Sequence, residues 1–166
     1  MNQALSSAII SKCGRYRYEL RRVFSAGPVA LWVMLNPSTA DARKNDPTVI
    51  RVAGFTRGMG YCGFIVCNVF GRRATYPEDL LDLTIDPVGG DNDEYLAKAA
   101  REAGVVICAW GANPLAVDRA PLVLKILRDN VAPGVEVLCM GTTASGAPRH
   151  PLYLPNRTKA VPYVGV

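Results

Sequence analysis

Residues 29–38, Val-Ala-Leu-Trp-Val-Met-Leu-Asn-Pro-Ser, form an apolar run that ends abruptly in polar residues. Seven apolar residues without a charge predict a strand that is buried on both faces. Similar runs follow along the chain, at residues 63–70, 105–110 and 135–140. Helical segments separate these runs, and strands that alternate with helices form mostly parallel sheets. The sequence therefore predicts a three-layer α/β/α fold with a mostly parallel central sheet.

The segments between the strands carry helix signals. Asp46 and Pro47 suit a helix N-terminus, and this helix is expected to end at Gly58 or Gly60. The acidic residues 91–94 suit the start of a second helix. That helix is expected to extend to residue 103 with Gly104 as its cap, and a third is expected over residues 121–130.

A hairpin is expected before the parallel strands. Residues 16–24 alternate between polar and apolar side chains, which is typical of a half-exposed strand. Ala26-Gly27-Pro28 predicts a turn after it. We therefore expect residues 16–24 and 29–35 to be antiparallel neighbours at the N-terminal side of the sheet.

Composition limits the class of protein. The chain has 166 residues, of which 49% are hydrophobic and 20% charged, so we expect one domain over residues 1–166 with a substantial core. No apolar run is long enough to predict a membrane span, and the N-terminus lacks a secretory pattern. Five cysteines, three of them in apolar strands, are expected to be reduced thiols of a cytoplasmic protein. The net charge of +5 permits a nucleic-acid partner.

No cofactor is predicted from the residue types. The chain has one histidine and no Cys-x-x-Cys pair, which argues against a metal site. It also lacks a phosphate-binding loop, a dinucleotide-binding glycine pattern and a serine-hydrolase elbow. The acidic residues 91–94 could suggest a metal site, but their place at a helix start favours capping.

Polar residues follow several of the predicted strands. Ligands of parallel sheets bind beyond the carboxyl ends of the strands, so a site is expected there. Asn36 is either a turn residue before proline or part of this site, and Asn68 is either a base-reading amide or a structural one. His150 is either a surface loop residue or a positioned group beside Arg149 that stabilises negative charge.

Two arginines follow another strand end. Arg72 and Arg73 either hold phosphates or pair with carboxylates of the same loop, among them Glu78, Asp79 and Asp82.

Motifs along nearly the whole chain resemble an uncharacterised bacterial and phage family, the domain of unknown function 1643. The motifs are Met34 to Asp41, Asn45 to Thr48, Asn68 to Phe70 with Arg73-Ala74-Thr75, Asp91-Asn92-Asp93, Trp110-Gly111, and Pro148 to Leu154.

The order of three motifs is also similar to the uracil-DNA glycosylase superfamily. Asn36-Pro37 matches its first motif, Asn68 its base-reading asparagine and His150-Pro151 its late His-Pro loop, although Met34 and Leu152 depart from its pattern. The resemblance implies that fold, with Asn36 positioning water and His150 stabilising the leaving base. It implies base contacts from Pro37, Ser38, Asn68 and Phe70, and DNA or phosphate contacts from Arg72, Arg73, Arg149, Leu152 and Tyr153.

The resulting functional expectation is a DNA-glycosylase-like enzyme that cleaves the N-glycosidic bond of a modified base without a metal or organic cofactor. Ser38 stands where the uracil-specific branch has a bulky tyrosine, which leaves space for a 5-substituted pyrimidine. The alternatives are a non-catalytic module that binds a nucleotide, a modified base or DNA, and an enzyme that acts on a small metabolite. A positive rim around the site favours DNA over a metabolite.

Overall fold

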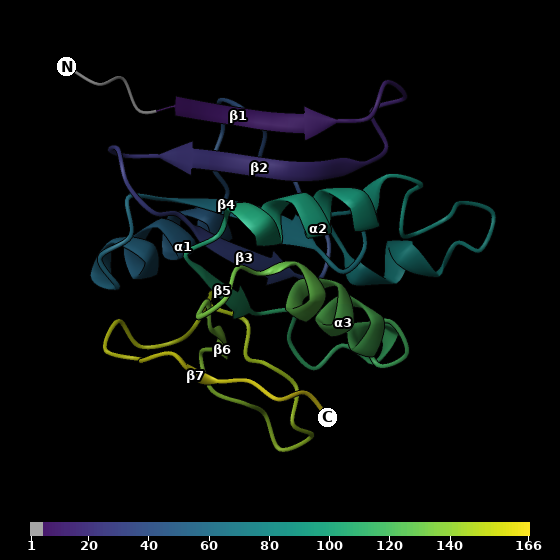
Figure 1. The fold of residues 1–166 in the computed structure, drawn as a ribbon. Helices are drawn as coiled ribbons and strands as arrows, with labels where there is room; N and C mark the ends of the chain where they lie inside the picture. The colour runs from purple at the N-terminus through teal and green to yellow at the C-terminus, as the bar shows by residue number, and fades with distance from the viewer. Residues whose placement is uncertain (1–4) are drawn as a thin grey trace.

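The computed structural model describes residues 5–166, which form a mixed seven-stranded sheet in the order β1-β2-β4-β3-β5-β6-β7 (Figure 1). Strands β3 to β6 run parallel to one another, and the strands at both edges are antiparallel to their neighbours. The strands are β1 (Leu5–Ile10), β2 (Arg17–Val23), β3 (Ala30–Met34), β4 (Gly63–Asn68), β5 (Val105–Cys108), β6 (Val137–Cys139) and β7 (Val161–Pro162).

Within residues 5–166, three α-helices cover the sheet. Helices α2 and α3 pack together on one face, in front of the sheet in Figure 1, and α1 packs on the other face. Each face has its own cluster of buried apolar side chains, so the predicted three-layer arrangement is confirmed. The helices are α1 (Pro47–Gly58), α2 (Asn92–Glu102) and α3 (Ala120–Asn130), with short 3₁₀ helices η1 (Pro77–Leu81) and η2 (Pro114–Ala116).

The chain changes direction across the sheet at β3. From β3 it passes through α1 to β4 on one side, and from β4 it passes through α2 to β5 on the other side of β3. From β5 it continues through α3 to β6, so the connections that follow the neighbouring strands β3 and β5 run in opposite directions, and their helices α1 and α3 lie on opposite faces. A crevice forms at such a switch point beyond the carboxyl ends of the strands. The topology thus places a candidate site at the ends of β3 and β5.

The predicted pairing of residues 16–24 with residues 29–35 is wrong. β2 pairs instead with β1 and with β4, both in antiparallel orientation. Both edges of β3 are occupied by parallel neighbours, because its residues are apolar on both faces and are buried best at the sheet centre. The expected N-terminal antiparallel hairpin does exist, but it consists of β1 and β2.

A bulge interrupts the β1–β2 hairpin. Ile9 pairs with Glu19 and Ile10 pairs with Arg17, which leaves Tyr18 without a partner on β1. The extra residue lets the neighbours on either side of it turn to opposite faces of the sheet. Tyr18 stacks on Tyr95 of α2, with the ring centroids 5.3 Å apart. Arg17 instead reaches the α1 side of the sheet, where its role becomes important.

The helix ends are only partly as predicted. Asp46 caps α1 by accepting a hydrogen bond from the Val49 N–H at 2.8 Å, as expected. The side chain of Asp91 makes no capping bond to α2. Gly104 does not cap that helix either. The helix ends at Glu102, and the Gly104 N–H donates to the carbonyl of Val29, the residue before β3.

The centre of the sheet contains buried cysteines and a buried tryptophan. Cys67, Cys108 and Cys139 are free and buried, as predicted. Burial raises the pKa of the Cys67 and Cys108 thiols far above the ordinary range, so both stay protonated. Trp32 is fully buried and donates from Nε1 to the Thr56 hydroxyl of α1 at 3.0 Å, which fixes this helix on the sheet. Among residues 5–166, the helices are all too short or too polar to cross a membrane.

Two glycines should respond oppositely to alanine. A Cβ atom on Gly63 would lie 2.6 Å from the Arg22 carbonyl oxygen and 2.8 Å from the Val23 Cα, so Gly63→Ala forces β2 and β4 apart. We expect it to lower the free energy of unfolding by about 1–3 kcal/mol. Gly54 lies in α1 with open space around it, and Gly54→Ala should raise that free energy by about 0.5–1 kcal/mol. Urea unfolding measures both changes, and equal effects of the two variants would contradict the close approach.

Candidate functional site

A cavity of about 260 Å³ lies at the carboxyl ends of β3 and β5; we call it the inner cavity. It combines groups from β2, from the end of β3, from the start of α1, from the end of β5 and from the loop after β6. Such convergence of polar groups from separate segments in one cavity is typical of a binding site. The lining residues that bear polar side chains are Arg17, Asn36, Ser38, Asp46, Thr48, Thr75, Trp110 and His150.

Asn36 lines the inner cavity and also makes hydrogen bonds that hold the main chain together. Its Nδ2 donates to the Ala74 carbonyl at 2.9 Å and to the Pro37 carbonyl at 3.1 Å. These bonds tie the end of β3 to the segment after β4 and fix the orientation of the amide. Since the donors are used, the remaining capacity of the side chain is that of its Oδ1 acceptor. An aspartate here would place a carboxylate against two carbonyl oxygens, which explains an amide at this position.

His150 lies on the loop that follows β6, where it lines the inner cavity and is at the same time exposed at the surface, as one of the two alternatives expected. Its Nδ1 accepts a hydrogen bond from the Leu152 N–H at 3.3 Å, so the neutral ring carries its proton on Nε2. Desolvation lowers the pKa of His150, and the carboxylate of Asp46 partly opposes that shift. The imidazole is therefore neutral near pH 7. Its Nε2–H is then free to donate a hydrogen bond to a ligand.

Arg17 and Asp46 join the site without having been predicted there. Asp46 caps α1 with one carboxylate oxygen and at the same time lines the inner cavity, where it supplies the one carboxylate among the lining residues. The capping signal was visible in the sequence, but its nearness to the site depends on α1 starting at the end of β3. Arg17 reaches the cavity because of the bulge in β2, for which the sequence carries no clear signal.

Asn68 lies beside the inner cavity but not in its lining. It is 1% exposed, and strand alternation places its side chain on the α1 face with Met34, its partner in register. Neither side-chain polar atom finds a hydrogen-bond partner within residues 5–166. A buried amide left without partners is rare and calls for an explanation. The predicted contact to a base would satisfy it, and that contact stays a prediction.

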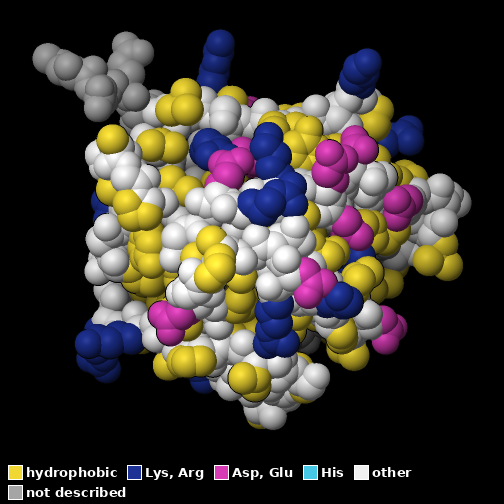
Figure 2. Space-filling model, viewed as in Figure 1, with side chains coloured by type: hydrophobic (Ala, Val, Ile, Leu, Met, Phe, Trp, Pro, Cys, Tyr) yellow, Lys and Arg dark blue, Asp and Glu magenta, His cyan; other side chains and the backbone are white. Residues whose placement is uncertain are grey.

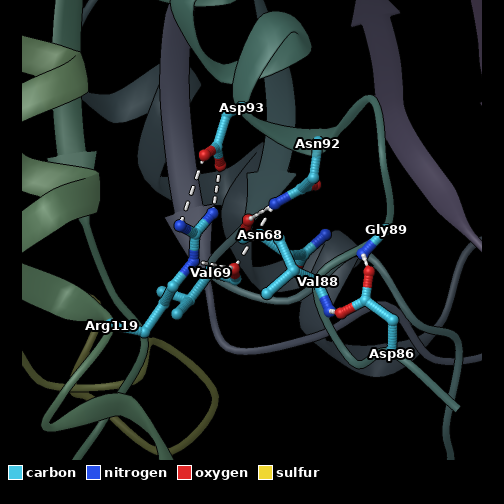
Figure 3. A network of polar contacts seen from close by, with 8 residues as sticks. All are labelled: Asn68, Val69, Asp86, Val88, Gly89, Asn92, Asp93 and Arg119. Atoms are coloured by element: carbon cyan, nitrogen blue, oxygen red, sulfur yellow. Dashed lines mark hydrogen bonds and ion pairs between the residues drawn. The ribbon is translucent and has the colours of Figure 1, made fainter.

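The main chain at the end of β4 is held from the other face (Figure 3). The buried Asn92 side chain of α2 donates to the carbonyls of Asn68 at 3.0 Å and Val69 at 3.3 Å. Arg119 donates to the Val69 carbonyl as well and forms an ion pair with Asp93. These contacts satisfy the carbonyl groups where the strand ends. They therefore fix the direction from which Asn68 projects.

Two of the three remaining residues predicted to contact a base, Pro37 and Phe70, are buried outside the cavity lining. Phe70 is 7% exposed and belongs to the apolar cluster under α2 and α3. Pro37 is buried, and its carbonyl accepts from Asn36 and from the Ala74 N–H. Ser38 does line the cavity. Asn36, Ser38 and His150 thus line one cavity, whereas Pro37 and Phe70 lie outside its lining.

A second cavity of about 620 Å³ adjoins the first and shares Ser38, Ala74 and Thr75 with it. We call it the outer cavity. Arg15, Arg72 and Arg73 line it, together with the single carboxylate of Asp79 among its lining residues. The outer cavity is therefore rich in positive charge. By contrast, acidic and basic side chains lie interspersed on the face covered by α2 and α3 (Figure 2).

The two predicted arginines of the outer cavity differ in their partners. Arg72 lies 3.8 Å from the Asp82 carboxylate and also bonds to the Asp82 carbonyl, so the expected pairing within the loop exists for this residue. Arg73 donates to the Gly14 carbonyl at 3.3 Å and has no ion-pair partner in the described part of the chain. Arg73 is thus the better placed of the two to bind an anion. Arg15, which the sequence analysis missed, is exposed beside it.

The predicted DNA-contacting residues after β6 lie on the surface near His150. Arg149 is exposed and donates to the Thr142 carbonyl at 3.2 Å. Tyr153 is 92% exposed, while Leu152 is half-buried. None of the three lines the inner or the outer cavity. An aromatic ring as exposed as that of Tyr153 is free to stack on a ligand outside the cavities.

Larger or more apolar hollows lie elsewhere on the molecule. One of about 850 Å³ lies between α1 and the segment 156–160, and one of about 510 Å³ lies between α3 and the last residues of the chain. The first borders the start of β5 rather than the carboxyl ends of the strands, and the second is mainly apolar. We therefore place the candidate site at the inner and outer cavities, where the switch point and the polar groups coincide.

Fold and site together define an α/β protein with a polar cleft at the switch point of a mostly parallel sheet. The family model of DUF1643, described as a protein of unknown function, matches residues 17–152, and the chain belongs to this family. The resemblance to that family is thus confirmed. No curated protein and no solved structure matches the chain.

The position of His150 leads to a pH prediction. Its pKa should lie below the ordinary value of about 6.5. Asp46→Asn removes the charge that opposes this shift, so it should lower the pKa further while still capping α1. Because His150 is the only histidine, its ring protons in an NMR pH titration report this pKa directly. The unfolded chain binds this proton more readily, so stability should decrease as the pH falls below about 6.5. A pKa at or above that value would contradict the desolvated position.

Proposed function

We propose that this chain is a DNA-glycosylase-like enzyme that cleaves the N-glycosidic bond of a modified base in DNA, with a fold like that of the uracil-DNA glycosylase superfamily. The observation that carries the proposal is the meeting of Asn36, Ser38 and His150 in one small cavity. Asn36 and His150 belong to motifs that resemble that superfamily, and they are separated by more than a hundred positions in the sequence. The adjoining cavity with Arg15 and Arg73 supports a polyanionic substrate.

The groups in the inner cavity suit hydrolysis of a glycosidic bond. Water attacks the sugar carbon, the carbon–nitrogen bond breaks, and its electron pair leaves with the base. The Oδ1 atom of Asn36 orients this water but cannot take its proton. The Asp46 carboxylate supplies the acceptor for that proton. His150, neutral at pH 7, donates from Nε2 to the departing base and stabilises its negative charge.

Two features support a modified pyrimidine as the base. The small side chain of Ser38 lies where the inner and outer cavities meet, so a 5-substituent has a path outward. The unpartnered amide of Asn68 offers both donors and an acceptor to a base edge if the base reaches it. The exposed Tyr153 is free to occupy the space that an extruded base leaves in the duplex.

A non-catalytic binding module is the second candidate function. The observation in its favour is that both Nδ2 bonds of Asn36 go to main-chain carbonyls, as in a purely structural amide. The same cavities would then bind a nucleotide, a modified base or DNA without bond cleavage. The two functions differ in one product, an abasic site.

Base release distinguishes these functions. The protein should produce abasic sites in DNA that carries a panel of modified bases, and the rate should fall by about 10²–10⁴ fold in His150→Ala and in Asp46→Asn. Ser38→Tyr should narrow the range of bases toward plain uracil. Asn130→Ala, which changes a surface amide of α3, serves as the control with unchanged rate. Complete lack of release would contradict catalysis, and release of plain uracil alone with an unchanged range in Ser38→Tyr would contradict the modified base.

The outer cavity predicts a salt-dependent contribution to DNA binding. Replacement of both Arg15 and Arg73 by alanine should weaken binding similarly for all sequences and reduce the slope of log K against log salt by about 1 for each lost phosphate contact. Arg101→Ala on the α2 face, where Arg101 pairs with Asn130, should leave the slope unchanged. Fluorescence anisotropy over a range of salt concentrations measures these slopes. Equal salt slopes in the unaltered protein, the double variant and Arg101→Ala would show that the outer cavity does not bind DNA.

A further inference from the structure

Arg17 is the most buried arginine that lines either cavity. It is 2% exposed, lies at the first position of β2, and borders the inner cavity. The bulge at Tyr18 turns it toward the α1 side of the sheet, away from the exposed edge at which an arginine is normally found. The fold thus buries a guanidinium group at the wall of the inner cavity.

The hydrogen bonds of Arg17 are incomplete. A guanidinium carries five N–H donors. Nη1 donates to the Ala40 carbonyl at 2.7 Å, which is the single bond of this guanidinium within residues 5–166. Nε is buried without a partner, and no carboxylate in that range forms an ion pair with the group. Most of its donors are therefore free for a ligand.

Arg22, on the same strand, shows what a structural arginine looks like in this protein. It is 7% exposed, and both Nε and Nη2 donate to the Asn45 Oδ1, at 3.0 and 2.9 Å. Further bonds reach the carbonyls of Asp41 at 2.6 Å and Arg21 at 2.9 Å. Arg22 does not line the inner cavity. Both arginines are buried, but only Arg22 has a hydrogen-bond acceptor for each of its three side-chain nitrogens, Nε, Nη1 and Nη2.

The charge of Arg17 is also incompletely balanced. Burial lowers the pKa of Arg17 to about 10, so the group is still a cation at neutral pH. Asp46 attracts it from the start of α1, but one oxygen of that carboxylate is held by the Val49 N–H. The charges of Arg73 and Arg22 act on Arg17 in the opposite sense. A buried cation with free donors is costly unless an anionic acceptor meets it.

We propose that Arg17 anchors an oxyanion-binding site in the inner cavity, which takes a carboxylate or phosphate group of the ligand. The planar guanidinium presents paired N–H groups that match two oxygens of either anion. Asn68, whose amide is buried without a partner and whose register partner Met34 lines the cavity, is a second unsatisfied polar group on the same face of the sheet. The site deepens the proposed function because it requires an anionic group on the ligand, but it does not depend on bond cleavage.

The test follows the Arg17 Nε–H signal by NMR during titration with inorganic phosphate, acetate and acetamide at constant ionic strength. Acetamide has the shape of acetate without its charge. We expect a saturable shift with phosphate or acetate and none with acetamide, and the anion that saturates first identifies the group. Arg17→Met should weaken the binding of that anion, measured by calorimetry, by about tenfold to a hundredfold.

Arg22→Met is the matched control, because it removes an arginine of the same strand that lies outside the cavity. It should lower stability, since it leaves the Asn45 amide and two carbonyls without a donor, and leave anion affinity unchanged. Arg17→Met should be at least as stable as the unaltered protein without anion, and should lose the increase in melting temperature that the anion produces. Arg17→Lys keeps the charge without the fork and should bind with intermediate affinity.

Two results would overturn this site. Absence of a saturable shift with both anions would show that Arg17 is a structural residue, and undiminished binding in Arg17→Met would place the anion in the outer cavity instead. The outcome for base release is measured separately. Anion binding without formation of abasic sites would support the oxyanion site and contradict the glycosylase. Base release that Arg17→Met leaves unchanged, in a protein that binds no anion, would support the glycosylase and contradict the oxyanion site.

Discussion

Strand β3 is hydrogen-bonded in parallel to β4 on one side and to β5 on the other, with Leu31 opposite both Ile65 and Val106. The rest of the structure depends on this double pairing. It buries β3 on both faces, sends α1 and α2 to opposite faces of the sheet, and brings the ends of the strands to one edge. Polar residues cannot be accommodated inside such a strand without partners, so they follow it. The candidate site is thus a consequence of how the core is paired.

The polar residues in and around the site differ in whether their side-chain donors have hydrogen-bond acceptors. Asn92 and Arg22 are buried and hold carbonyl groups of neighbouring segments. Asn36 does the same with its nitrogen and keeps its oxygen available. Arg17 and Asn68 are as buried as these residues, but donors on each lack acceptors. The contrast lies within one protein, so burial alone does not account for it, and a ligand is the simplest common partner for the two open groups.

Local patterns in the sequence were sufficient for the parallel strands and their helices. Apolar runs of five to eight residues can be buried only in a covered sheet, and Asp46-Pro47 marks the start of α1 by local stereochemistry. The edge strands were harder to predict. β1 contains serines and is half-exposed, and β7 has two residues, so neither carries a hydrophobic pattern. The position of β2 next to β4 depends on competition among strands for the edges of β3, which no local pattern records.

The sequence by itself determined the fold class, the family, and the placement of Asn36 at a strand end and of His150 on the loop after a later strand, because these follow from periodicity and short motifs. Tertiary structure alone decided which polar residues share a cavity. It separated Phe70 from Asn36, and it brought in Arg17 through a bulge and Asp46 through the start of a helix. Burial and hydrogen-bond partners are properties of contacts between distant segments. They therefore distinguish Arg17 from Arg22, two arginines of one strand that regular alternation would place on opposite faces and that the bulge at Tyr18 brings to the same face.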